Sequence, residues 1–236
     1  SDPEKRFRKR YLDILFHPET KALFEKKALF WKAIRDFLHH EGFLEVETPV
    51  FEVTPGGAEA EPFVTHHNAL DQDFYLRISL ELALKRLMVA GFEKVFEIGR
   101  IFRNEGIDAE HLQDYTQMEC YAAYQDYGSL MQLIERMMKA AIKQTCGSLV
   151  TTRDGKKIVW SKKWPKLDYY TLFKKGTGLD LDGVTMDELL EKAKSLTLPY
   201  LSPSLGEGRL IDLLFKHTVR HTLVQPAFLI NPPVVI

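Results

Sequence analysis

Hydrophobic and polar residues alternate with two different periods along the chain. From 19 to 40 the apolar residues fall three or four positions apart, which predicts a long amphipathic helix that ends at Gly42. The same spacing from Leu80 to Met88 predicts a second helix, with Ser79 as its cap. Further helices are predicted at 128–145, 185–195 and 206–222.

Extended segments lie between these helices. Strands are predicted at 62–66, 73–78, 94–105, 115–124 and 225–230, with a further extended segment, interrupted by proline, at 45–51. Asp154-Gly155 separates two short extended runs, as the turn of a hairpin does. Helices and strands are mixed without a regular βαβ alternation. We therefore expect an α+β fold, built around an antiparallel β-sheet flanked by helices.

Composition places the chain among ordinary folded proteins. Of its 236 residues 45% are hydrophobic and 28% charged, and the net charge of -1 gives no overall attraction to nucleic acid. The basic run at 5–10 is interpreted as a solvated helix face or a linker rather than a phosphate contact. Two cysteines suit a reducing compartment. With no apolar run of ~20 residues and no secretory leader pattern, we expect a cytoplasmic protein with no membrane contact.

Several common catalytic motifs do not occur. The sequence has no P-loop, no dinucleotide-binding glycine fingerprint and no nucleophile elbow. His217 and His221 have the spacing of a zinc helix, but Thr218 stands where a metalloprotease needs glutamate. The chain begins without methionine and ends on an apolar run, so we expect a piece of a longer protein.

Polar side chains concentrate on one face of the two strands predicted at 94–105 and 115–124. Alternation places together Glu97, Gly99, Ile101, Arg103 and Glu105 on the first strand, and Tyr115, Gln117, Glu119 and Tyr121 on the second. An apolar core would not contain this set, because unpaired buried charges are costly. The face suits a ligand with phosphate and ammonium groups. A solvated face with cross-strand Arg–Glu pairs is an equally open interpretation.

These residues resemble the signature motifs of the class II aminoacyl-tRNA synthetases, in particular the lysyl family. The segment 102–106 with His111 and 115–121 resembles motif 2, and 43–49 resembles motif 1. Further matches to the lysyl family lie at 10–13, 55–58, 65–70, 75–78 and 225–228. An ordered series of matches is far more specific than any one of them.

The resemblance implies a class II catalytic core, with residues 1–236 as a partial catalytic domain. It implies a lysine–tRNA ligase that uses ATP to form lysyl-adenylate and then transfers lysine to tRNA(Lys). Arg103 would be catalytic and hold the α-phosphate and the lysine carboxylate. Glu105 and His111 would bind the nucleotide, and Tyr115 would stack on its adenine. Gly57 and Glu81 would bind the α-amino group of lysine. Glu119 and Tyr121 would bind its ε-amino group. Glu81 also has a structural interpretation, as an acid in the first turn of a helix.

The resemblance further implies a homodimer through the motif 1 region and Mg2+ in the intact protein. Motif 3, with its phosphate-binding arginine and metal-binding acids, and the anticodon-binding barrel lie outside the 236 residues. No metal ligands are therefore assigned within the chain, and we expect the piece alone to be inactive.

Three other functions remain open. Leu112 stands where the lysyl family usually has asparagine, as in aspartyl and asparaginyl synthetases, and Asp114 and Gln117 are also unusual. Acids at both Glu81 and Glu119 favour lysine over an acidic or amide substrate. The second alternative is a synthetase-like enzyme that lysylates a protein, against which the segment 10–13 argues, since it follows the barrel in the lysyl family. The third is a non-catalytic paralogue.

Overall fold

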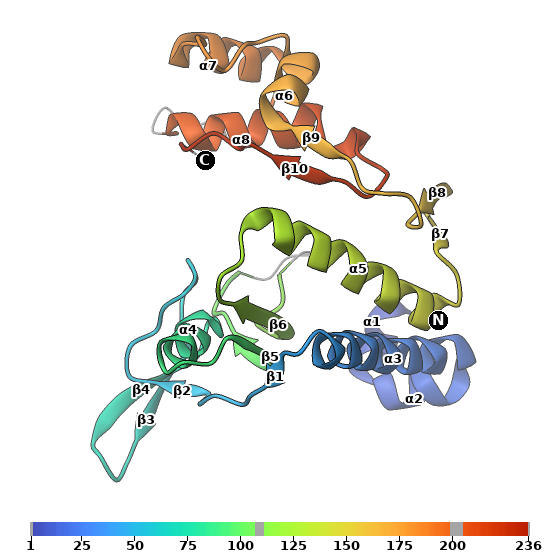
Figure 1. Cartoon of the computed structure of the whole chain (residues 1–236), viewed down its shortest axis with the longest axis vertical. Coiled ribbons are helices and arrows are strands. Elements are labelled where there is room, and N and C mark those ends of the chain that lie inside the picture. The colour runs from blue at the N-terminus through green and yellow to red at the C-terminus, as the bar shows by residue number, and fades with distance from the viewer. Residues whose placement is uncertain (1, 107–110, 199–204, 236) are drawn as a thin grey trace. The chain divides into compact units, whose positions relative to one another are not determined.

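The computed structural model describes residues 2–106, 111–198 and 205–235, and the chain divides into two compact units, Ser1–Ala141 and Ile142–Ile236 (Figure 1). Within the described residues no helix is both long enough and apolar enough to cross a membrane.

The first unit is built around a three-stranded sheet with the order β1-β5-β6. Its strands are β1 (Leu44–Glu45), β5 (Lys94–Phe102) and β6 (Asp114–Ala122). Strands β5 and β6 run antiparallel, with Glu97 opposite Glu119 and Gly99 opposite Gln117. The short β1 pairs with β5 in parallel. The two predicted strands thus pair with each other in antiparallel orientation.

Helices cover both faces of this sheet (Figure 1). On one face lies α4 (Glu81–Val89), whose apolar stripe buries Leu84 against Val95 and Ile101. On the other lie α3 (Pro18–His40) and α5 (Tyr127–Cys146), which pack on Phe96. The α+β fold with an antiparallel sheet flanked by helices is confirmed.

A second small sheet has the order β2-β4-β3. It comprises β2 (Phe51–Glu52), β3 (Val64–His67) and β4 (Gln72–Leu76). Its strands are antiparallel. The chain passes from the end of β4 through Arg77 and Ser79 into α4, so this small sheet positions the start of α4.

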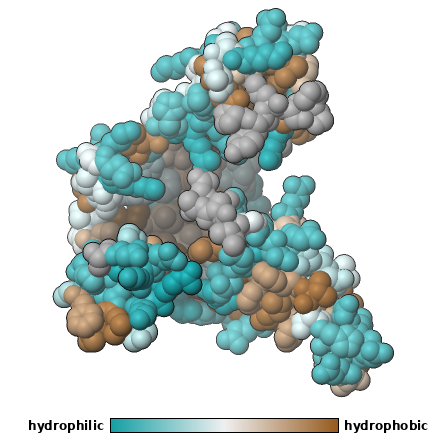
Figure 2. Space-filling view, turned by 180° about the vertical axis from the view of Figure 1, so that it is seen from behind, coloured by the Kyte–Doolittle hydropathy of each residue, from teal (hydrophilic) through white to brown (hydrophobic). Residues whose placement is uncertain are grey.

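The N-terminal basic run is helical. It forms α1 (Pro3–Arg8) and the start of α2 (Arg10–Phe16). Two of its arginines are not simply solvated, because Arg6 and Arg10 donate to the buried carboxylate of Asp13 at 2.6 and 2.5 Å. Figure 2 shows hydrophobic surface over these N-terminal helices, at the lower left of that view. Large exposed apolar side chains here are Phe7, Tyr11, Leu15, Phe16 and Leu23.

The second unit has its own core and two small pairs of strands. The hairpin β7 (Val150–Arg153) and β8 (Lys156–Val159) turns at Asp154 and Gly155, both with positive φ, as predicted. Strands β9 (Lys166–Asp168) and β10 (Phe228–Ile230) pair in parallel. The helices are α6 (Tyr169–Thr177), α7 (Met186–Ser195), α8 (Glu207–Thr218) and the 3-10 turn η1 (Arg220–Thr222), and their apolar faces bury Phe173 and Leu214.

Several predicted boundaries were wrong. The strand predicted to reach 105 ends at Phe102, so Arg103 and Glu105 lie beyond it and strand alternation does not place them. The helix predicted at 206–222 ends at Thr218. The structure also contains α1, α2, α6 and β9, which the sequence pattern did not predict.

Candidate functional site

The Glu119 carboxylate lies on the α4 side of the sheet and accepts hydrogen bonds from four donors. Its Oε1 accepts from the Ser79 hydroxyl at 2.9 Å, the Leu80 main-chain N–H at 3.0 Å and the Gln117 side-chain amide at 2.6 Å. Its Oε2 accepts from the Tyr121 hydroxyl at 3.1 Å. Glu119 is therefore fixed in one orientation before any ligand arrives.

The start of α4 supplies two of these donors. Leu80 occupies the N-cap position without a side-chain cap, so the predicted cap at Ser79 was one residue early. The Ser79 hydroxyl nevertheless accepts from the Glu81 N–H at 3.1 Å while it donates to Glu119. A carboxylate at this position is also stabilised by the partial positive charge of the helix N-terminus.

Tyr121 is held in its protonated form. Burial and the adjacent Glu119 carboxylate raise the pKa of its hydroxyl well above the ordinary value. The hydroxyl therefore remains a donor toward Glu119 across the physiological range. Together the two side chains present a negative oxygen next to a fixed phenol, an arrangement suited to a bound ammonium group.

Gly57 and Glu81 come together at the same end of α4. Gly57 has φ +87°, and a Cβ on it would lie 2.9 Å from Cβ of Glu81 and 3.1 Å from Cβ of Ser79. Only glycine allows the main chain to approach the helix so closely. Glu81 forms an ion pair with Lys85 at 2.6 Å, so its structural interpretation as an acid of the first turn also holds.

The residues assigned to the nucleotide form two pairs, Arg103 with Tyr115 and Glu105 with His111. The Arg103 guanidinium lies 5.8 Å from the centre of the Tyr115 ring, and its Nε donates to the Ile78 carbonyl at 3.2 Å. His111 Nε2 lies 3.9 Å from a carboxylate oxygen of Glu105. Arg103 therefore shares the α4 side of the sheet with Tyr115, although the strand has ended before it.

Sequence reasoning missed Arg77, which forms a buried ion pair on this face. Its Nη1 lies 2.6 Å from Oε1 of Glu97, and both side chains are 4% exposed. Oε2 of Glu97 accepts from the Thr48 hydroxyl at 2.6 Å. A Cβ on Gly99 would lie 2.2 Å from Arg77 Nη2. An isolated glycine inside a strand often marks such a close approach, so Gly99 was the available signal.

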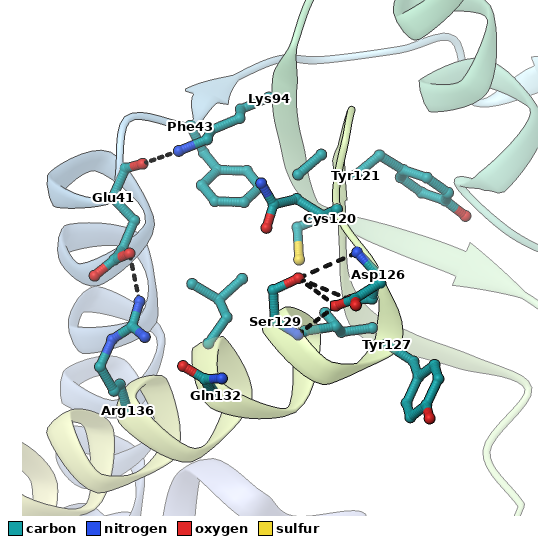
Figure 3. Close-up of a pocket in the computed structure, with 14 residues that line it drawn as sticks. Glu41, Phe43, Lys94, Cys120, Tyr121, Asp126, Tyr127, Ser129, Gln132 and Arg136 are labelled. Carbon is teal, nitrogen blue, oxygen red and sulfur yellow. Dashed lines mark hydrogen bonds and ion pairs between the residues drawn. The ribbon is translucent and has the colours of Figure 1, made fainter.

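A cavity of about 500 Å³ lies on the opposite face of β6 (Figure 3). The Cys120 thiol points into it, whereas the side chain of Tyr121 points away. One wall is fixed by Glu41, whose carbonyl accepts from Lys94 at 3.0 Å and whose carboxylate pairs with Arg136 at 2.6 Å. Burial raises the pKa of Cys120. Of the residues assigned to the site, only Tyr121 also lines the cavity, so the cavity and the site are largely distinct.

The described residues do not form a magnesium site by themselves. Across 2–106, 111–198 and 205–235, no three His, Cys, Asp or Glu side chains gather in a way that could hold a metal ion.

Residues 2–234 match the class II tRNA synthetases of the D, K and N group, and the chain belongs to this family. The resemblance found in the motifs is thereby confirmed.

Curated relatives narrow the similarity further. A lysine–tRNA ligase of Moorella thermoacetica is 45% identical over 236 residues, which are 100% of this chain and 48% of that protein. A lysine–tRNA ligase of Prochlorococcus marinus (strain MIT 9215) is 43% identical over 99% of the chain and 46% of its own length. A lysine–tRNA ligase of Synechococcus sp. (strain RCC307) is 44% identical over 99% of the chain and 47% of its own length. The chain spans about half the length of these relatives.

Proposed function

We propose that these residues belong to a lysine–tRNA ligase. The enzyme joins lysine and ATP to give lysyl-adenylate and pyrophosphate, and then transfers the lysyl group to tRNA(Lys). The relatives that match the whole chain carry this name. The observation that carries the proposal is Glu119, a carboxylate held by four neutral donors and, among the described residues, by no Lys, Arg or His.

The first step needs positioning and charge stabilisation more than a covalent nucleophile. A lysine carboxylate oxygen attacks the α-phosphorus, the bond to the bridging oxygen breaks, and its electron pair leaves with pyrophosphate. We assign Arg103 to the α-phosphate and the lysine carboxylate, because a guanidinium grips such oxygens in two places. Tyr115 offers a ring to adenine, and Glu105 and His111 complete the nucleotide end.

The amino acid extends from this end toward α4. We assign the ε-ammonium to Glu119 and Tyr121, and the α-ammonium to Glu81 and the main chain at Gly57. The close approach of the main chain at Gly57 to Glu81, where an added Cβ would lie 2.9 Å from Cβ of Glu81, supports the second assignment. The ion pair of Glu81 with Lys85 must then open or be shared when lysine binds.

We also propose a homodimer through the motif 1 region. Exposed apolar side chains on α3 and β1 support it, since a hydrophobic patch of this kind marks an interaction surface; they are Leu23, Phe24, Leu29 and Leu44. Light scattering on the full-length protein at micromolar concentration tests this proposal, and a monomer there contradicts it.

Amino-acid-dependent exchange of labelled pyrophosphate into ATP tests the function. The full-length protein should show exchange with lysine and little with aspartate or asparagine. Exchange that prefers aspartate or asparagine assigns the chain to another member of its family. Absence of exchange with all three indicates a non-catalytic paralogue. Lysine transfer to a protein rather than to tRNA indicates the lysylating alternative.

A further inference from the structure

Resting on the proposed function, we infer that the hairpin β7–β8 and the loop after it form a docking surface for the phosphate backbone of the tRNA. Positive charge is concentrated there, since the segment 153–166 contains six basic residues and one acid. The basic residues, all of them exposed, are called the hairpin cluster; they are Arg153, Lys156, Lys157, Lys162, Lys163 and Lys166.

The two units of the chain carry opposite net charges. Ser1–Ala141 contains 18 Lys and Arg and 24 Asp and Glu, which gives -6, whereas Ile142–Ile236 contains 14 and nine, which gives +5. The unit that contains the candidate site therefore repels a polyanion overall. The second unit attracts one, and six of its 14 cations belong to the hairpin cluster.

The charges of the hairpin cluster are available to a ligand. Among the described residues, none of its five lysines forms an ion pair. The one acid of the segment, Asp154, lies 3.7 Å from Arg153, and the two side chains are 88% and 84% exposed, so water screens this pair strongly. The segment 221–236, which packs beside β8 and β9, contains no Asp or Glu.

The main chain beneath these lysines is held in place by that neighbouring segment. The Gln225 amide donates to the Lys157 carbonyl at 2.8 Å, and its oxygen accepts from the Val159 N–H at 3.0 Å. The Phe228 N–H donates to the Pro165 carbonyl at 2.9 Å. The lysine side chains thus extend from a preorganised backbone, which lowers the ordering cost of binding.

The composition of this surface favours a nucleic-acid backbone over a membrane. From 151 to 166, all within the described part of the chain, no large apolar side chain is exposed, whereas membrane-binding surfaces combine cations with apolar side chains that insert. Trp164 is buried, and Trp160 donates its Nε1–H to the Thr151 hydroxyl at 2.9 Å. Exposed lysines without exposed aromatic rings suit phosphate contacts that carry no sequence information.

The test measures how the full-length protein uses tRNA(Lys). One variant combines Lys156→Gln with Lys157→Gln, and a second combines Lys162→Gln with Lys163→Gln. Each pair should raise the KM for tRNA in lysine transfer about fivefold and make the slope of log Kd against log salt shallower by about two, at ~0.9 per phosphate contact. Lysine-dependent pyrophosphate exchange without tRNA should stay within about twofold, which also shows that the variants are folded.

Two controls separate a local surface from overall charge. Lys175→Gln with Lys194→Gln removes two exposed, unpaired lysines of the same unit and should change the KM for tRNA less than about twofold. Lys156→Arg with Lys157→Arg keeps the charge and should bind tRNA like the wild type.

An unchanged KM for tRNA in both glutamine pairs of the hairpin cluster, or an equal rise in the control pair, overturns the inference. Binding to phosphatidylserine vesicles that the glutamine pairs abolish, with an unchanged KM for tRNA, assigns the cluster to a membrane instead and overturns it as well. A wild-type protein that transfers no lysine to tRNA refutes the proposed function itself, before any variant is compared.

Discussion

Glu119→Gln is the sharpest perturbation of the proposed site, because the structure accommodates glutamine. Its amide oxygen in the place of Oε1 keeps the bonds from Ser79, Leu80 and Gln117. Its NH2 group in the place of Oε2 faces the Tyr121 hydroxyl, which turns from donor to acceptor. All four contacts survive, so the free energy of unfolding should change by less than about 1 kcal/mol. What disappears is the negative charge.

The loss of charge should be large for lysine and small for ATP. Breaking a buried charge pair costs ~3–5 kcal/mol, because the partner's charge is left desolvated without compensation. Each ~1.4 kcal/mol is a factor of ten, so kcat/KM for lysine should fall by roughly two to three orders of magnitude. The KM for ATP should stay within about threefold, since Arg103 and Tyr115 are unchanged.

Lysine-dependent pyrophosphate exchange in the full-length protein measures both constants. Glu93→Gln, the same change at an exposed glutamate, is the matched control and should leave both unaltered. If Glu119 merely belongs to a solvated strand face, its replacement costs under ~1 kcal/mol and changes no preference among lysine, aspartate and asparagine. A decrease of less than about fivefold with unchanged preference would therefore refute the assignment.

Three further predictions concern stability and thiol chemistry. Glu97→Gln should lower the free energy of unfolding by ~3–5 kcal/mol in urea titrations, because it leaves its buried arginine partner without a counter-charge; a loss below ~1 kcal/mol contradicts this. The hydrogen bond from Arg6 holds the pKa of Asp13 below its ordinary value of 3.8 despite the opposing effect of burial, so its stabilisation is present above that pH and lost as pH falls through the lower folded pKa. Thermal midpoints of the wild type and Asp13→Asn should therefore differ near pH 7, begin to approach each other below about pH 3.8 and coincide only below the lower folded pKa. Burial raises the pKa of Cys120, whereas Cys146 is exposed, so maleimide should label Cys146 at least about tenfold faster in peptide mass spectra, and equal rates refute the reasoning.

Strand periodicity was sufficient to place three of the eight assigned site residues, Tyr115, Glu119 and Tyr121. Alternation placed Tyr115, Gln117, Glu119 and Tyr121 on one face, and the register of β5 with β6 confirms it. This succeeded because a strand's side chains point to alternate faces whatever surrounds it. It failed for Arg103, which follows the end of β5 and is held instead by its bond to Ile78.

The missed contacts are those between segments far apart in the sequence. Arg77 precedes its partner Glu97 by 20 residues and also donates to the Thr48 carbonyl, 29 residues earlier. Near the N-terminus, the partners of Asp13 were hidden within a run that looked like solvated charge. Hydrophobic periodicity reports which side of an element is buried, but it does not report which charges will meet there.

Glu97 and Glu119 face each other across β5 and β6, and the difference between their partners explains why Glu119 suits a cationic ligand. Carboxylates directly opposite on one sheet face repel each other, so at least one needs compensation. Glu97 receives it from the buried Arg77 guanidinium, with which it is paired at 2.6 Å. Glu119 receives only neutral donors from the described residues, which orient the carboxylate without cancelling its charge. Only the charge of Glu97 is therefore compensated by a cation, and a cation bound at Glu119 would compensate the second negative charge. A lysine ammonium does so, whereas the side chain of aspartate would add a third negative charge to the same face.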